Sequence, residues 1–180
     1  MSGLVQVGNA GLREVCKALS VAEISHKKTQ QLMDRLYKKL KSISGVGLAA
    51  PQVGVNKRLF VVSIEPTKYR PNVERVAAYA VINPEIVSAS HTEDSEYEGC
   101  FSVAHADLFA KVIRPSEINV RYYNEHGEQV ERSISGLEAR VFLHEYDHLN
   151  GKVFLDTKVD FSTFMSANEY KAMRAEQLAN

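Results

Sequence analysis

The chain has 180 residues, carries 22 basic and 22 acidic side chains, and is 44 % hydrophobic. This length predicts a single domain over residues 1–180, built around one hydrophobic core. The net charge of zero gives no large electrostatic surface for nucleic acid or anionic lipid. The longest apolar run, residues 76–82, is far shorter than the roughly 20 residues that cross a bilayer. We therefore expect no membrane association and no direct nucleic-acid readout.

Cysteine is used sparingly, at positions 16 and 100 only. Two cysteines in a chain of this length do not make a disulfide framework, so each is either a buried apolar residue or part of a reactive site. Cys16 is expected to be buried and inert. This usage favours a reducing compartment, and we expect the protein to be cytoplasmic.

The first predicted helix covers residues 27–43. Its apolar side chains recur at Leu32, Leu36, Leu40 and Ile43, which places them on one helical stripe opposite the lysines. Its basic residues are therefore interpreted as the solvated face of a helix.

Strands follow, because β-branched and aromatic residues then gather in short runs between turn signals. They are predicted at residues 58–64, 79–82, 85–88, 108–113, 118–123 and 129–134. The stretch 65–72, with two prolines, is predicted to be a surface loop. The last two strands are expected to form an antiparallel hairpin around residues 124–127.

A second long helix is predicted to begin at Ser135, because Ser135 and Glu138 have the spacing of a capping box. Gly151 is its expected end. A C-terminal helix is predicted from Ser162 to Leu178, although its amphipathic pattern is weak.

The helix after Ser135 carries the strongest chemical signal, the pattern H-E-x-x-H. His144 and His148 lie four residues apart on one helical face, close enough to bind one metal ion, and Glu145 between them can reach a water activated by it. Leu137 and Val141 continue the same face as an apolar strip.

A catalytic metal usually has three protein ligands, so a third must lie elsewhere. The metzincin pattern would place a histidine at position 154, which is Phe. The gluzincin pattern would use a downstream glutamate, and Glu169 is available. Cys100, directly after a glycine, is the better candidate, although taken alone it would be interpreted as a buried inert thiol. Glu98 and Arg114 could form an ion pair that braces this segment or an ordinary surface pair.

A third segment, residues 45–52, is rich in glycine and small residues and ends in Gln52. It lacks the Gly-Lys-Ser/Thr of a phosphate loop, and alone it would be a plain turn between helix and strand. Glycine permits close approach of a ligand to the backbone, and the Gln52 amide is a donor that can polarise a carbonyl group.

Taken together, the three segments closely resemble the peptide deformylase family. That family has the motifs G-x-G-x-A-A-x-Q, E-G-C-x-S and H-E-x-D-H-L-x-G, which match residues 45–52, 98–102 and 144–151. The resemblance implies an α+β fold in which antiparallel β-sheets wrap around a central metal-binding helix, with an N-terminal and a C-terminal helix. It also implies hydrolysis of the formyl group from the N-terminal methionine of nascent proteins.

The resemblance also implies a role for each matched residue. Cys100, His144 and His148 would hold the metal, and Glu145 would be the general base and acid. Gln52 and the backbone N–H of Phe101 would bind the formyl oxygen. The substrate backbone would pair with Val46 and Gly47, and its methionine would lie on Leu137 and Val141.

One thiolate and two imidazoles suit zinc or iron(II). The family implies Fe²⁺ in the cell, with Zn²⁺, Ni²⁺ or Co²⁺ as substitutes. It further implies a formyl-methionyl nascent peptide as partner and transient ribosome association, for which we expect the tail from Ser162 to be the contact.

Two alternatives stay open from the sequence. One is a zinc peptidase with His144, His148 and Glu169 as ligands. The other is a catalytically silent relative that binds N-termini, suggested by Leu143, where the family usually has Gln, and by Phe101, where Leu is commoner.

Overall fold

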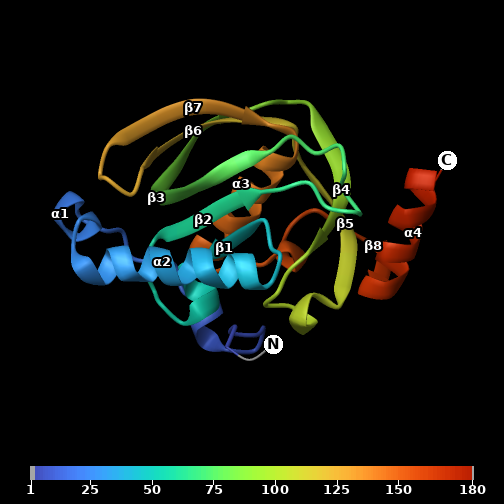
Figure 1. Cartoon of the computed structure of the whole chain (residues 1–180), viewed down its shortest axis with the longest axis horizontal. Helices are drawn as coiled ribbons and strands as arrows, with labels where there is room; N and C mark the ends of the chain where they lie inside the picture. The colour runs from blue at the N-terminus through green and yellow to red at the C-terminus, as the bar shows by residue number, and fades with distance from the viewer. Residues whose placement is uncertain (1–2, 180) are drawn as a thin grey trace.

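Two antiparallel sheets and four α-helices make up residues 3–179, the part of the chain that this computed structural model describes (Figure 1). Residues 1–2 and 180 of the predicted domain lie outside it. The helices are α1 (Val21–Ile24), α2 (Lys27–Ser42), α3 (Gly136–Leu149) and α4 (Ala167–Ala179). The strands are β1 (Gly47–Ala49), β2 (Leu59–Ile64), β3 (Val76–Ala89), β4 (Glu93–Gly99), β5 (Leu108–Pro115), β6 (Glu117–Tyr123), β7 (Gln129–Ser135) and β8 (Val159–Ser166). Short 3₁₀ turns lie at Ala10–Arg13, Ala50–Val53, Ala104–Ala106 and Phe154–Asp156.

The first sheet has the strand order β1-β2-β3-β6-β7, and the second has the order β4-β5-β8. Every strand pair in both sheets is antiparallel. The predicted class, α+β with antiparallel sheets, is confirmed. Strands β1 and β4 each lie at the edge of their sheet, so each has one side free of a neighbouring strand.

Helix α3 packs against both sheets, touching β1, β2, β6 and β7 of the first and β5 of the second (Figure 1). Its Phe142 is fully buried and meets the Phe60 ring edge to face, with centroids 5.0 Å apart. The helix ends as predicted, because Gly151 adopts φ +71, and a Cβ there would collide with the Arg13 backbone.

Several local predictions are confirmed. The helix predicted at 27–43 is α2, with Leu36 and Leu40 buried against the first sheet. The predicted strand at 58–64 is β2, and the predicted hairpin is β6–β7. Cys16 is buried, and burial raises the pKa of its thiol to about 11, which makes it unreactive.

The predicted break between strands 79–82 and 85–88 is wrong. Both belong to β3, whose pairing with β6 shifts register between Ile82 and Glu85. Asn83 adopts φ +50 at this bulge. Its side chain accepts a hydrogen bond from the Leu19 N–H and donates one to the Leu19 carbonyl, so a distant segment stabilises the irregularity.

The capping box predicted at Ser135 is also wrong, although α3 does begin there. The Ser135 side chain makes no cap hydrogen bond. Glu138 instead accepts hydrogen bonds from the Tyr79 hydroxyl at 2.9 Å and from Arg132 at 2.6 Å. The Glu138 carboxylate is therefore bound by side chains of the strands and does not take part in a helix cap.

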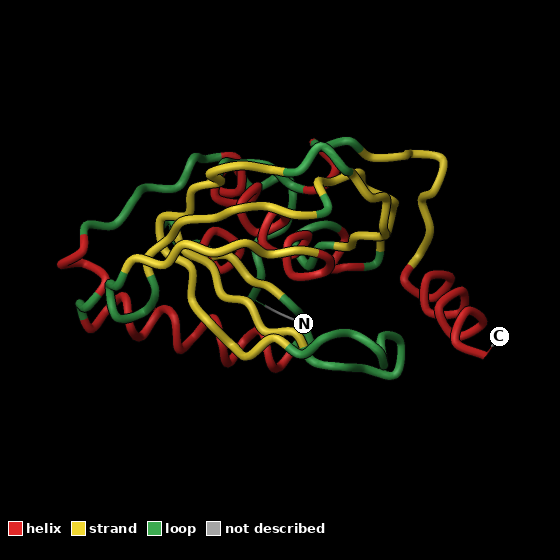
Figure 2. Tube along the Cα trace, turned by 90° about the horizontal axis from the view of Figure 1, so that it is seen from above, coloured by secondary structure: helices red, strands yellow, loops and turns green. Residues whose placement is uncertain are grey.

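The predicted C-terminal helix is correct only from Ala167 onward. Residues 162–166 belong to β8, where Met165 pairs with Phe109 of β5. Figure 2 shows α4 standing out from the rest of the molecule at the C-terminal end. Among the described residues, no helix has the length and apolar character needed to cross a bilayer.

Candidate metal centre

Three potential metal ligands converge where the end of β4 meets α3. Cys100 directly follows β4, while His144 and His148 lie one turn apart on α3. One ligand atom from each lies within 4.8 Å of the others, and the distance from Cys100 Sγ to His148 Nε2 is 3.2 Å. Cys100 is 2 % exposed and His148 is 1 % exposed. Glu169, the alternative third ligand, is exposed on α4 and does not belong to this group.

A buried carboxylate fixes the first histidine. Glu98 Oε2 accepts a hydrogen bond from His144 Nδ1 at 2.8 Å, which leaves His144 Nε2 as the nitrogen available to a metal. Histidine ligands commonly donate their other N–H to a carboxylate in this way, which sets the tautomer and the ring orientation. Burial lowers the pKa of His148, so its imidazole is neutral and able to ligate at neutral pH.

Glu98 itself lies in a buried ionic network. It accepts hydrogen bonds from Arg114 at 2.6 and 3.0 Å and from Arg140 at 2.8 Å, and Arg114 also donates to Asp147 at 2.8 Å. Burial alone would raise the pKa of Glu98, but the hydrogen bonds from His144 and Arg114 outweigh it and hold the pKa well below its usual range. The Glu98–Arg114 pair therefore braces the Cys100 segment from inside the molecule.

Sequence reasoning missed two members of this network, Arg140 and Asp147. Arg140 lies between Ala139 and Val141 on α3 and is buried with them. A charged residue among buried apolar neighbours signals a buried partner. Asp147, inside the H-E-x-x-H segment, lacks this signal, because its neighbours are Tyr146 and His148.

Glu145 points its carboxylate into the same region. It is 3 % exposed, and burial raises its pKa to about 7. Its Oε2 has no hydrogen-bond partner among the described residues. The backbone of β1 runs close by, since a Cβ on Gly47 would lie 2.5 Å from Glu145 Oε1. Only glycine leaves room for this carboxylate beside the edge of β1.

Gln52 supplies an oriented amide to the site. Its Oε1 accepts a hydrogen bond from the Ala49 N–H at 2.8 Å, so its Nε2 faces Ser102 Oγ at 3.3 Å and Cys100 Sγ at 3.7 Å. Gln52 is 2 % exposed. Phe101, between Cys100 and Ser102, is half-buried.

The residues expected to contact substrate also lie together. Val46, Leu137 and Val141 belong to one apolar cluster, and a Cβ added at Gly47 would lie 2.8 Å from Val141 Cγ1. Leu143 is buried in the same cluster.

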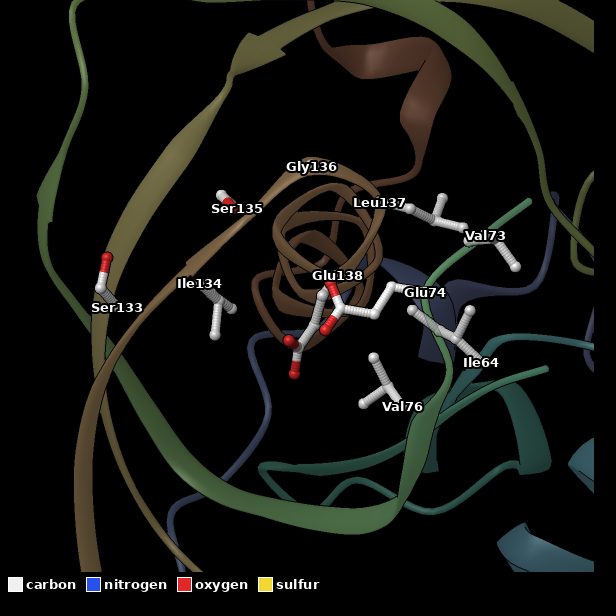
Figure 3. A pocket seen from close by; sticks show the side chains of 10 residues that line it. All are labelled: Ile64, Val73, Glu74, Val76, Ser133, Ile134, Ser135, Gly136, Leu137 and Glu138. Carbon is white, nitrogen blue, oxygen red and sulfur yellow. The ribbon is translucent and has the colours of Figure 1, made fainter. Parts of the chain in front are cut away.

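A cavity of about 390 Å³ lies at the N-terminal end of α3 (Figure 3). Leu137 and Val73 line one side of it, and the carboxylates of Glu74 and Glu138 point into it. It contains none of the metal-ligand candidates, so it is separate from the reactive centre and shares only Leu137 with the apolar strip.

The donor set fits a catalytic metal. A buried thiol and two imidazoles provide three ligands of the kind that zinc and iron(II) accept, which leaves a coordination position for solvent or substrate. Glu145, which follows His144 directly in the chain, has a buried oxygen without a hydrogen-bond partner among the described residues.

Comparison with known proteins agrees with this geometry. The family model for polypeptide deformylase matches residues 1–163. This chain belongs to the peptide deformylase family. Peptide deformylases of Hydrogenovibrio crunogenus and Prosthecochloris aestuarii are 38 % and 39 % identical to it, over 97 % and 81 % of this chain and 95 % and 73 % of their own lengths.

Solved peptide deformylase structures share the fold. The class I type b peptide deformylase of Acinetobacter baumannii, bound to Met-Ala-Ser, has a TM-score of 0.81 at 33 % identity, over 85 % of this chain and 95 % of that one. The peptide deformylase of Thermotoga maritima has a TM-score of 0.73 at 34 % identity, over 86 % and 95 %. The family removes the formyl group from the N-terminal methionine of new proteins, so this chain is a hydrolase. Helix α4 lies beyond the family match.

Proposed function

We propose that this peptide deformylase acts through one divalent metal ion held by Cys100, His144 and His148, so that α3 is the central metal-binding helix of the fold. Fe²⁺ is the metal we infer for the cell, with Zn²⁺, Ni²⁺ or Co²⁺ able to replace it. The observation that carries the proposal is the convergence of a buried thiol and two imidazoles within 4.8 Å of one another. The zinc peptidase alternative lacks this support, because Glu169 is exposed on α4.

Different groups of the chain carry out proton transfer and charge stabilisation. When bound, a divalent metal supplies Lewis-acid chemistry and lowers the pKa of a water to about 7. Glu145 takes the proton of the attacking water and returns it to the amine as the formyl C–N bond breaks, which yields formate and a free N-terminus. The Gln52 Nε2 and the Phe101 N–H stabilise the negative charge that develops on the formyl oxygen.

The peptide binds by adding to a sheet edge. Strand β1 has a free edge beside Glu145, so the backbone of Val46 and Gly47 can pair with an extended substrate. The methionine side chain then lies on the apolar surface of Leu137 and Val141. The Acinetobacter baumannii relative holding Met-Ala-Ser supports a short methionyl peptide as ligand.

The partner that we infer is the formyl-methionyl nascent peptide, met during transient association with the ribosome in the cytoplasm. The tail from Ser162 is the proposed contact. It is supported by the position of α4, which stands out from the molecule and has no fully buried side chain (Figure 2).

The Gly47→Ala variant tests the close approach of β1 to the general base. The new Cβ would overlap Glu145 Oε1, so the carboxylate must move. Because displacements near 1 Å cost on the order of 10²-fold in rate, we expect kcat for deformylation to fall by about that factor. Metal content and thermal stability are measured in parallel. A variant with unchanged kcat would show that the Glu145 position does not matter.

Metal dependence tests the proposed function itself. Chelated protein is expected to release no formate from a formyl-Met tripeptide, and anaerobic addition of Fe²⁺ is expected to restore release. Cys100→Ala should abolish stoichiometric metal binding in equilibrium dialysis, whereas Glu169→Ala should leave it intact. Loss of binding in the Glu169 variant alone would overturn the ligand assignment in favour of the peptidase arrangement.

A further inference from the structure

The N-terminal segment, residues 5–7, contacts both parts of the chain that carry the proposed donors to the formyl oxygen. The Val5 N–H donates to the Gln52 carbonyl at 2.9 Å, and the Val7 N–H donates to the Ser102 carbonyl at 2.8 Å. In Figure 1 this segment runs along the lower edge of the molecule, near the 3₁₀ turns that follow β1 and precede β5. One short stretch of chain therefore ties Gln52 to the residues that follow Cys100.

Between these two bonds, the Gln6 side chain makes a two-point contact with the Cys100 loop. Its Nε2 donates to the Phe101 carbonyl at 2.8 Å, and its Oε1 accepts from the His105 N–H at 3.1 Å. Gln6 is half-buried, and neither of these two bonds goes to a metal-ligand candidate or to the Phe101 N–H. The amide thus bridges the two ends of the turn from Phe101 to His105.

That turn has a backbone conformation that needs external support. Ala104, His105 and Ala106 adopt φ values of 45, 56 and 65 in succession. Non-glycine residues avoid this left-handed region, and consecutive ones persist only where surrounding contacts hold them. The bond from His105 to Gln6 is one such contact, and the Ala106 N–H adds a second by donating to the Cys100 carbonyl at 3.1 Å.

We propose that Gln6 is a positioning residue for deformylation. Its side chain holds the Phe101 carbonyl and the turn at His105, and the next residue of that turn, Ala106, donates to the Cys100 carbonyl. The Cys100 carbonyl shares a peptide plane with the Phe101 N–H, so the turn sets the direction of that N–H. The inference rests on the proposed role of that N–H at the formyl oxygen. Loss of the Gln6 contacts would leave the metal ligands in place but weaken stabilisation of the charge that develops in the transition state. Interactions made only in the transition state appear in kcat and not in KM.

The test compares Gln6→Leu with Gln30→Leu in metal-loaded enzyme. Gln30 is a matched control, since it is also half-buried and its amide also bonds two backbone groups, here the carbonyls of Ile24 and Glu125, away from the site. We expect kcat for a formyl-Met tripeptide to fall roughly tenfold in Gln6→Leu, a part of the 10²–10³-fold typical of a whole oxyanion donor. KM and metal content should stay within twofold, and Gln30→Leu should keep the parent kcat.

Gln6→Glu provides an independent readout and replaces Gln6→Leu if that variant does not fold. It keeps an acceptor for His105 but has no donor for the Phe101 carbonyl, so the same fall in kcat is expected. Unchanged kcat in both Gln6 variants would overturn the inference, as would an equal fall in Gln30→Leu or a fall explained by lost metal. Gln52→Ala in the same assay distinguishes a failure of the Gln6 inference from a failure of the proposed oxygen-binding site. If kcat falls in Gln52→Ala but not in the Gln6 variants, only the role of Gln6 is rejected. If Gln52→Ala is also unchanged, the proposed oxygen-binding site fails with it.

Discussion

Replacing Glu145 with glutamine is expected to lower formate release from a formyl-Met tripeptide by about 10²–10⁴-fold, the usual contribution of general acid–base catalysis. The substitution keeps the shape of a buried side chain whose Oε2 has no partner among the described residues, so the fold should be unaffected. The variant loses only the capacity to take a proton from the attacking water and pass it to the leaving amine.

The measurement is steady-state formate release with metal content determined on the same samples. Glu145→Gln should bind one metal ion per chain, because Glu145 is not among the three converging ligands. Glu169→Gln is the matched control, since Glu169 is exposed on α4, and it should retain the parent rate. A Glu145→Gln enzyme that works at the parent rate would remove this residue from the mechanism.

Replacing Glu98 with glutamine is expected to have the largest effect on stability. Glu98 has a side chain 5 % exposed and is the common partner of Arg114, Arg140 and His144. Breaking a buried ion pair by removing one partner costs about 3–5 kcal/mol in free energy of unfolding, because the remaining charge stays buried without compensation. Urea denaturation of the metal-free proteins measures this loss.

The same variant should also bind metal more weakly, by about 10–100-fold, because His144 loses the carboxylate that orients its ring. Glu131→Gln is the control, since it breaks the exposed pair between Arg121 and Glu131 and should leave stability and metal affinity unchanged. If Glu98→Gln and Glu131→Gln had the same free energy of unfolding, the account of Glu98 as the stabilising partner of the metal-ligand residues would be wrong.

Local patterns predicted the parts of the molecule that depend on nearby residues. Helix α2 follows from apolar spacing alone, and the histidine pair follows from its position on one face of a helix. The glycine before Cys100 makes this residue a candidate third ligand, but the family motifs were needed to assign it, because no spacing rule connects Cys100 with a helix that begins 36 residues later.

Tertiary contacts decided the features that local patterns predicted wrongly or missed. Strand β4 reads Glu-Asp-Ser-Glu-Tyr-Glu-Gly, a charged stretch with little strand propensity, and it forms because β5 pairs along its whole length. Glu138 matched a helix cap, but Arg132 and Tyr79 from neighbouring strands bind it instead. Gln6 lies about 95 residues from the Phe101 carbonyl that it contacts, a separation that no pattern along the chain encodes.

The most direct measurement of the central claim is X-ray absorption at the zinc edge of the zinc-loaded protein. A centre formed by Cys100, His144 and His148 predicts one sulfur at about 2.3 Å and nitrogen or oxygen ligands at about 2.0–2.1 Å. In Cys100→Asp, which keeps an oxygen ligand at this position, the sulfur contribution should vanish, and in Cys16→Ala it should persist. A spectrum without sulfur in the parent protein, or one in which the sulfur survives the Cys100 substitution, would contradict the account.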